Sequence, residues 1–201
     1  MRSKVLIVGY GTQGKKRAAI LRSDYDIFIV DPIEGDANAK DLSNVDLNQF
    51  EAAFICVPDK EKMALLSAVL EAIPRVLVEK PLNISEADVN KLTELCQVSD
   101  GKLYIAYNHR FEPALIDIKE AVSGEFAEEI YKIRLAYKNG TARNVRDSVW
   151  RDVGSGVFED LGAHVFDILN FIFEPNFLEI EYFSKNLKIK NKTKTPKFGL
   201  I

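Results

Sequence analysis

The residues with the plainest chemical meaning are three glycines near the start of the chain, in the run Gly9-Tyr10-Gly11-Thr12-Gln13-Gly14. In a dinucleotide site the first glycine allows a tight turn and the second lets the backbone approach a pyrophosphate. The third lets the following helix pack closely on the preceding strand. The start of that helix offers free N–H groups and a positive dipole end to phosphates. The spacing therefore predicts a phosphate-binding turn, with a plain cluster of turn glycines as the alternative.

A carboxylate follows where such a site uses one. Asp31 ends the second apolar run, 22 residues after Gly9. It can accept hydrogen bonds from both hydroxyls of an adenosine ribose and would repel a 2′-phosphate, so NAD is favoured over NADP. The alternative is that Asp31 only begins the turn at Pro32. Lys15 and Lys16 can add attraction for phosphates, although Lys16 and Arg17 fit a plain helix surface equally well.

Two more segments lie where apolar runs end, Cys56-Val57-Pro58 and Glu79-Lys80-Pro81. In a doubly wound sheet, ligands bind outside the carboxyl ends of the strands. We therefore expect both segments, and Lys80 in particular, beside a nicotinamide. Pro81 favours an extended backbone at Lys80. The alternative for Lys80 is an ordinary surface lysine.

The second half of the chain carries a polar face on an apolar helix. Asp160, His164 and Asp167 are spaced i, i+4, i+7 and so share one side of it. A neighbouring stripe is apolar, which indicates a largely buried helix. Such a polar face predicts either a site or an internal hydrogen-bonded pair. The other histidine, His109, is interpreted as structural or as joining two domains.

A repeating pattern of strands and helices must position these groups. Short apolar runs occupy residues 5–8, 27–30, 53–57, 76–79 and 103–107, and helical patterns occupy 13–22, 60–73 and 85–98. Nearly continuous apolar runs are typical of parallel strands that are buried on both faces. Strand and helix in alternation predict an open, doubly wound sheet over residues 1–110.

The pattern changes over residues 111–201. A helix is predicted at 113–122, an alternating half-exposed strand at 129–138, a helix at 160–173 and one or two strands within 178–195. The predicted fold class is therefore α/β: an N-terminal Rossmann doubly wound parallel sheet, followed by an α+β domain with a shortened, mostly antiparallel open sheet. Six lysines between 185 and 197 are best explained as the solvated face of a strand, with phosphate contact as the alternative.

Composition narrows the class of protein further. The 201 residues are 47% hydrophobic and 28% charged with a net charge of −3, which is typical of a soluble globular protein. This balance gives no reason to expect nucleic-acid or membrane-surface binding. Two cysteines and two histidines make no convincing zinc set, and no apolar run approaches a membrane span. We expect a cytoplasmic protein without a structural metal.

The chain resembles the glucose-fructose oxidoreductase / inositol dehydrogenase (Gfo/Idh/MocA) family across residues 4–167. The resemblance lies in the order and spacing of five features: the glycine turn, Asp31, Glu79-Lys80-Pro81, residues 107–111 and the Gly156…Asp160…His164 run. The resemblance implies a Rossmann domain joined to an α/β domain whose open sheet forms a substrate platform. That sheet is often a subunit interface, so a homo-oligomer is expected if it is complete. The resemblance also implies NAD(P)-linked oxidation or reduction of a carbohydrate-like hydroxyl or ketone.

Carried over by position, Lys80 matches the family's lysine near the reacting hydroxyl, and Asp160 and His164 match its substrate-side acid and histidine. His164 is the preferred general acid/base because its reference pKa lies near neutral pH. Lys80 would hydrogen-bond the same oxygen, and Asp160 would orient the substrate or favour charged His164. The chain departs from the family at Lys62, where a histidine is usual, a change that bears on local cofactor or substrate contacts.

The family's second domain is normally longer, so the sequence is either truncated or a shortened member. The predicted function is that of an NAD-dependent dehydrogenase or reductase of a sugar, nucleotide sugar or related polyol. One alternative is a non-catalytic dinucleotide-binding sensor or assembly subunit. Another is an oxidoreductase of the same fold that acts on a non-sugar ketone or imine.

Overall fold

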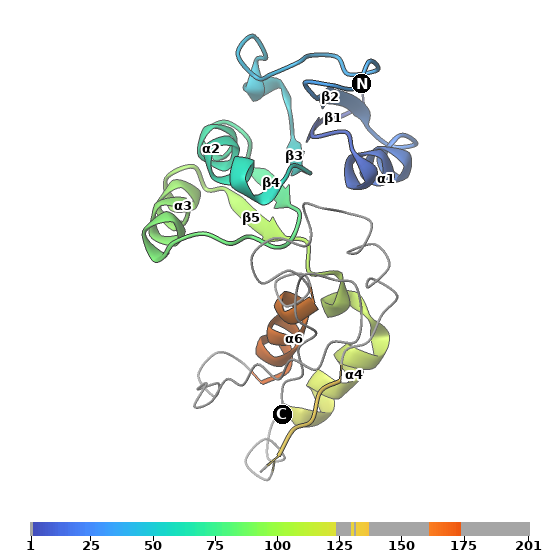
Figure 1. Cartoon of the computed structure of the whole chain (residues 1–201), viewed down its shortest axis with the longest axis vertical. Helices are drawn as coiled ribbons and strands as arrows, with labels where there is room; N and C mark the ends of the chain where they lie inside the picture. The colour runs from blue at the N-terminus through green and yellow to red at the C-terminus, as the bar shows by residue number, and fades with distance from the viewer. Residues whose placement is uncertain (1, 124–129, 131, 137–160, 174–201) are drawn as a thin grey trace, which may run out of the picture. The chain divides into compact units, whose positions relative to one another are not determined.

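The computed structural model describes residues 2–123, 130, 132–136 and 161–173 of the chain. The chain divides into two compact units, Met1–Ala106 and Tyr107–Ile201. The first unit holds a parallel sheet with helices, and the described part of the second unit holds helical segments (Figure 1).

The first unit is built on a five-stranded sheet in the order β2-β1-β3-β4-β5, with every pairing parallel. The short apolar runs form these strands because both faces of the sheet are covered. The strand order reverses between β1 and β3, and in doubly wound folds ligands bind outside the carboxyl ends of the strands at such a point. The strands are β1 Lys4–Val8, β2 Asp26–Val30, β3 Ala52–Ile55, β4 Arg75–Val78 and β5 Lys102–Ile105.

Helices cover both faces of this sheet (Figure 1). Along β1, successive side chains point to opposite faces, so Ile7 belongs to one core and Leu6 and Val8 to the other. Helix α1 (Thr12–Leu21) packs on the Ile7 face through Ala18. Helices α2 (Asp59–Leu70) and α3 (Glu86–Val98) form the larger core on the opposite face. The predicted doubly wound arrangement is confirmed.

Local signals start the helices where the sequence predicts them. Ser85 and Asp88 form a capping box: the Ser85 hydroxyl accepts the Asp88 N–H at 3.1 Å, and the Asp88 carboxylate accepts the Ser85 N–H at 3.3 Å. Helix α2 follows Pro58 and has Asp59 and Glu61 in its first turn, where negative charges interact favourably with the positive end of the helix dipole. A 3-10 turn, η1 (Leu47–Gln49), precedes β3.

All five strands and three helices predicted for residues 1–110 are found, with bounds that differ by at most three residues. Strand β3 stops at Ile55, short of the predicted 57; Cys56 still donates to the Val8 carbonyl, and the chain then enters α2 after its N-cap Pro58. A single parallel bridge joins Val30 to Ala39 at the outer edge of β2, which the sequence pattern did not indicate.

In the second unit, the 3-10 turn η2 (Asn108–Phe111) leads into α4 (Pro113–Val122), as predicted with proline in the first turn. Helix α6 spans Ala163–Phe173. The two helices pack on each other, and the Lys119 ammonium donates to the Phe171 carbonyl at 2.8 Å.

The predicted antiparallel sheet of the second domain is not seen in the residues that the structure describes. Residues 130 and 132–136 belong to neither helix nor strand, so the strand predicted at 129–138 is not confirmed there. Alternation of apolar and polar residues indicates two unlike faces, but a strand also needs a partner to pair with. The predicted strands within 178–195, with their lysines, lie outside the described residues.

Candidate functional site

Two glycines explain why the turn between β1 and α1 is tight. Gly9 has φ +90°, and a Cβ there would lie 2.6 Å from the Cys56 carbonyl oxygen. A Cβ at Gly14 would lie 2.0 Å from the Gly9 carbonyl oxygen. Both positions therefore exclude side chains, and α1 can start directly against the end of β1.

The middle glycine has the opposite surroundings. A Cβ at Gly11 would meet nothing within 4 Å, so the space beside this backbone is open. Gly11 is also the N-cap of α1 and provides no side-chain hydrogen bond to the first turn, which holds no acidic residue. Open space beside bare helix N–H groups fits a pyrophosphate, and this is the property for which a glycine is required there.

Asp31 lies directly beside this turn, at the end of β2. Its side chain is buried, and one carboxylate oxygen accepts the Tyr10 N–H at 2.7 Å, while the other accepts those of Ile33 and Glu34 at 2.9 Å each. Burial by itself raises the pKa of this carboxyl. The backbone N–H groups and the nearby Lys40 ammonium outweigh burial and hold the pKa below its usual value. Asp31 therefore stands ionised and in a fixed orientation.

Lys15 does not point its charge into the glycine turn. Its ammonium pairs with the Glu34 carboxylate at 3.1 Å and lies 5.6 Å from the centre of the Tyr10 ring. Both members of the ion pair are well exposed, so the pair contributes little stability.

The other two predicted segments leave adjacent strands at the same edge. The Cys56 N–H donates to the Val8 carbonyl at 2.7 Å, and the Glu79 N–H donates to the Ile55 carbonyl at 2.9 Å. Cys56 and Glu79 thus continue the sheet one residue past the ends of β3 and β4. The predicted cofactor residues of this unit gather at the carboxyl edge of β1 to β4: Gly9, Gly11, Thr12, Gln13, Gly14, Asp31, Val57, Pro58, Glu79 and Lys80.

The Cys56 thiol at this edge is expected to be a poor nucleophile. Burial, with a smaller effect of the Glu79 carboxylate, raises its pKa to about 12. A thiol with that pKa carries almost no thiolate near neutral pH, so nucleophilic chemistry at Cys56 is disfavoured.

Arg17 supports the Glu79-Lys80-Pro81 segment from α1, a contact that the sequence analysis did not predict. Its guanidinium donates twice to one Glu79 carboxylate oxygen, at 2.7 and 3.0 Å. The Glu79 side chain is only 12% exposed. The sequence spacing of 62 residues carries no sign of the pair.

Lys62 supports the same segment from α2. Its side chain is 2% exposed, and its ammonium donates to the Asp59 carboxylate at 3.1 Å and to the Pro81 carbonyl. Burial lowers the pKa of Lys62, an effect opposed by the carboxylates of Asp59 and Glu79 and reinforced by the Lys80 ammonium. In the sequence, the only sign of a role for Lys62 is that it stands where the family usually has a histidine.

The second unit gathers another polar cluster around α6. His164 is buried, and its ring meets the His109 ring edge-on at 4.7 Å between centroids and the Tyr107 ring at 6.2 Å. The His109 Nδ1 lies 2.6 Å from the Glu112 carboxylate. His109 therefore packs on the predicted general acid/base, a contact that is compatible with the structural role expected of it.

Asp167, on the same helix, forms an internal ion pair. Its two oxygens accept three hydrogen bonds from the Arg110 guanidinium, at 2.5 to 3.0 Å, and its side chain is 5% exposed. The hydrogen bonds that Arg110 donates to Asp167 raise the pKa of Arg110, and burial together with the Asp167 charge raises the pKa of Tyr107. For Asp167, the internal-pair alternative holds.

The predicted catalytic residues are divided between the two units. Lys80 belongs to the first unit and His164 to the second, and Asp160 lies outside the described residues. Within the described ranges, no group of three or more His, Cys, Asp or Glu is placed to hold a metal ion. None of the described helices has the length and apolar character that a membrane crossing requires.

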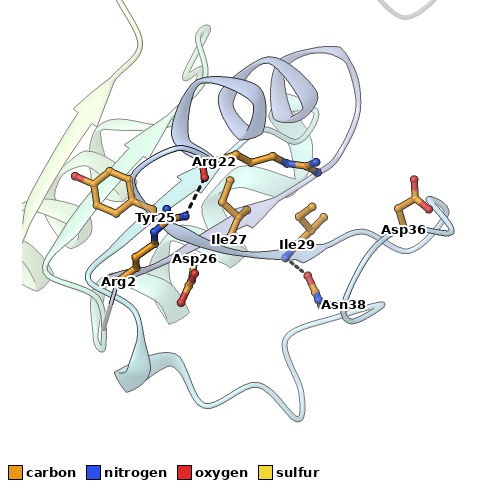
Figure 2. Close-up of a pocket in the computed structure, with 8 residues that line it drawn as sticks. All are labelled: Arg2, Arg22, Tyr25, Asp26, Ile27, Ile29, Asp36 and Asn38. Atoms are coloured by element: carbon orange, nitrogen blue, oxygen red, sulfur yellow. Dashed lines mark hydrogen bonds between the residues drawn. The ribbon is translucent and has the colours of Figure 1, made fainter.

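A pocket of about 420 Å³ lies elsewhere, along β2 (Figure 2). Its wall combines β2 with the loop that follows, where the Asn38 side chain accepts the Ile29 N–H at 2.8 Å. No predicted site residue lines it, so it is no candidate for the cofactor. The lining residues are Arg2, Arg22, Tyr25, Asp26, Ile27, Ile29, Asp36 and Asn38.

Comparison with known proteins identifies the family of this fold. Residues 3–107 match the family GFO_IDH_MocA, described as "Oxidoreductase family, NAD-binding Rossmann fold". The chain belongs to this family. The matched residues include the whole parallel sheet, the glycine turn, Asp31 and Lys80.

Individual members of the family share only a modest sequence identity with this chain. Inositol 2-dehydrogenase 1 of Saccharopolyspora erythraea is 28% identical over 145 residues, which make up 70% of this chain and 40% of that protein. Myo-inositol 2-dehydrogenase of Thermotoga maritima is 27% identical over 89 residues, 44% of this chain and 27% of that protein. This Gfo/Idh/MocA chain therefore spans less than half the length of these curated relatives.

Solved structures share the fold of this family member. GenD2 from gentamicin A biosynthesis, determined in complex with NAD, superposes with a TM-score of 0.64 at 20% identity. The match covers 87% of this chain and 54% of that one. A myo-inositol dehydrogenase from Corynebacterium glutamicum gives 0.60 at 22% identity, over 86% and 55% of the two chains.

Proposed function

We propose that this protein is an NAD-dependent oxidoreductase that exchanges a hydride with a hydroxyl or ketone carbon of a sugar, nucleotide sugar or related polyol. The observation that carries the proposal is the convergence at one sheet edge of an open glycine turn, an ionised Asp31 and the Glu79-Lys80-Pro81 segment. Relatives named as inositol dehydrogenases add support for a polyol-like substrate.

Asp31 would select NAD over NADP. Both of its oxygens already accept backbone N–H groups, so the carboxylate cannot turn away from a ribose at this edge. Three of its roughly four acceptor positions are used, which leaves capacity for a ribose hydroxyl. A 2′-phosphate would meet a fixed negative charge, although the Lys15 and Lys40 ammonium groups nearby would soften the repulsion.

The nicotinamide ring, when bound, supplies the hydride acceptor or donor. The residues of this chain would handle the proton and the orientation of the substrate. Lys80 would donate a hydrogen bond to the reacting oxygen, and His164 would take or return its proton. Asp160 would orient the substrate or favour the charged form of His164.

A titration with NADH and NADPH, followed by nicotinamide fluorescence, tests the cofactor half of the proposal. We expect NADH to bind at least tenfold more tightly than NADPH, and Asp31→Asn to narrow that gap. Lys60→Ala, at an exposed lysine of α2, is the matched control and should change neither affinity. Equal affinities for the two cofactors in the unaltered protein would contradict the role given to Asp31.

Turnover with NAD and a panel of polyols, sugars and nucleotide sugars, read at 340 nm, tests the catalytic half. Lys80→Ala and His164→Ala should each lower kcat by orders of magnitude and leave NADH affinity nearly unchanged. Wild-type turnover in both variants would refute the assigned roles. Tight NADH binding without turnover on any substrate would instead favour a dinucleotide-binding sensor.

A further inference from the structure

The segment that carries Lys80 is clamped from both sides of the sheet. From the α1 side, Arg17 fixes the Glu79 carboxylate through two hydrogen bonds. From the α2 side, the Lys62 ammonium donates to the carbonyl of Pro81. Lys80 lies between the two anchored residues, so its backbone is fixed before and after it in the chain.

Lys62 is an unusual anchor because it is the largest fully buried side chain in the part of the chain that the structure describes. Lysine is almost never fully buried unless it is paired. Here the ammonium is matched by two acceptors, the Asp59 carboxylate at 3.1 Å and the Pro81 carbonyl. The lysine stem fills the space between α2 and the segment that follows β4.

Asp59 extends the clamp one step further along the chain. The carboxylate oxygen that accepts from Lys62 also accepts the Asn83 N–H at 3.3 Å. Lys62 and Asp59 together therefore bind the backbone at Pro81 and Asn83. The charged groups that interact with Lys62 come from α2 and from the end of β4: Asp59, Glu79 and Lys80.

We propose that Lys62 is a positioning residue, whose buried ammonium holds the 79–83 segment so that Lys80 is presented in one orientation at the carboxyl edge of the sheet. The inference rests on the proposed function for Lys80 as a catalytic residue. Lys62 itself lies beneath that segment and needs no contact with substrate. A displacement of about 1 Å in a reacting group can cost on the order of 100-fold in rate, so a loose segment should lower kcat.

Lys62→Met is the first test, because it keeps the apolar stem and removes the donor. Lys60→Met, two residues earlier on the exposed side of the same helix, is the matched control. Hydrogen exchange followed by mass spectrometry should show amides of residues 79–83 exchanging several-fold faster in Lys62→Met only. Amides of the glycine turn should be unchanged, which separates local release from general destabilisation.

Kinetics provide the second measurement. Where the wild type turns over, Lys62→Met should lower kcat roughly 10- to 100-fold, with KM and the Kd for NADH within about twofold. Asp59→Asn, at a partly exposed side chain, is the fallback if Lys62→Met does not fold, and it should shift exchange and kcat in the same direction by less.

The outcomes separate this inference from the proposed function. Unchanged exchange over 79–83 in a folded variant refutes the clamp, whether or not the enzyme turns over. Faster exchange with an unchanged kcat refutes the positioning role. A wild type without turnover counts against the proposed function alone, and the exchange result then decides whether Lys62 holds the segment.

Discussion

Alanine substitutions at two glycines of the same turn should fail in different ways. A Cβ at Gly14 would lie 2.0 Å from the Gly9 carbonyl oxygen, whereas ordinary van der Waals contact begins at 3.4 Å. The obstacle is backbone, so no side chain can rotate away. Either α1 or the turn must retreat by roughly 1 Å or more, at a cost of about 1–3 kcal/mol typical of overpacking.

Gly11→Ala meets no such obstacle. Its Cβ has nothing within 4 Å, and Gly11 has φ −72°, which any residue adopts. An alanine N-cap in place of glycine costs at most about 1 kcal/mol. Its methyl group would, however, occupy the open space in which a pyrophosphate must approach the backbone, so NADH affinity should fall while stability is largely kept.

Thermal unfolding and NADH titration on Gly11→Ala, Gly14→Ala and the exposed-site control Lys60→Ala measure both effects. A loss of 1–3 kcal/mol corresponds to a fall in Tm of about 2–12 °C for a chain of this size. We expect that fall in Gly14→Ala, at least a tenfold loss of NADH affinity with a small Tm change in Gly11→Ala, and neither effect in Lys60→Ala. Wild-type stability in Gly14→Ala, or wild-type NADH affinity in Gly11→Ala, would refute this account of the turn.

Three further predictions concern charged and thiol groups. Because the pKa of Asp31 is lowered in the folded state, its ionised form stabilises the fold above the unfolded pKa of about 4, and this contribution is lost as pH falls through the folded pKa. Urea denaturation should therefore show the stability gap between wild type and Asp31→Asn shrinking from pH 7 to pH 3, and a constant gap would contradict it. Arg110→Met should lower the unfolding free energy by about 1–3 kcal/mol, since Asp167 stays buried without its guanidinium partner, whereas Lys132→Met at an exposed site should change it little. Cys56, with a pKa of about 12, should react with iodoacetamide at pH 8 far more slowly in the native protein than in urea, and equal rates would show that the thiol is not shielded.

The parallel sheet could be predicted because its information is local. Each strand is a short apolar run with turn residues at its ends, and the strands recur at helix-length intervals. The glycine turn and Asp31 were predictable for the same reason, since both are defined by their distance from a strand end. The strand predicted at 129–138 rested on alternation alone, which indicates two faces and says nothing about a pairing partner.

The residues that hold the candidate site in place could not be predicted from local sequence patterns. Arg17 and Lys62 each look like an ordinary charged residue on an amphipathic helix. Asp59 lies one turn from Lys62, but nothing local in the sequence marks the contact of Arg17 with Glu79 or of Lys62 with Pro81. The same holds for His109, whose contact with His164 joins residues 55 positions apart. Such contacts depend on how helices lie against the sheet, and that arrangement follows from packing of the whole core.

The topology nevertheless explains why these particular charges reach the site. In a parallel sheet every strand ends at the same edge, and α1 and α2 begin directly after β1 and β3, so their first turns lie at that edge. Arg17 and Lys62 are the sixth and fourth residues of these helices. A long cationic side chain within two turns of such a helix start can extend to the segment that leaves the neighbouring strand. In this chain both do so, and the segment between them carries Lys80. The side chains that hold the Lys80 segment therefore come from the first two turns of the helices that flank it, and not from the Glu79-Lys80-Pro81 motif itself.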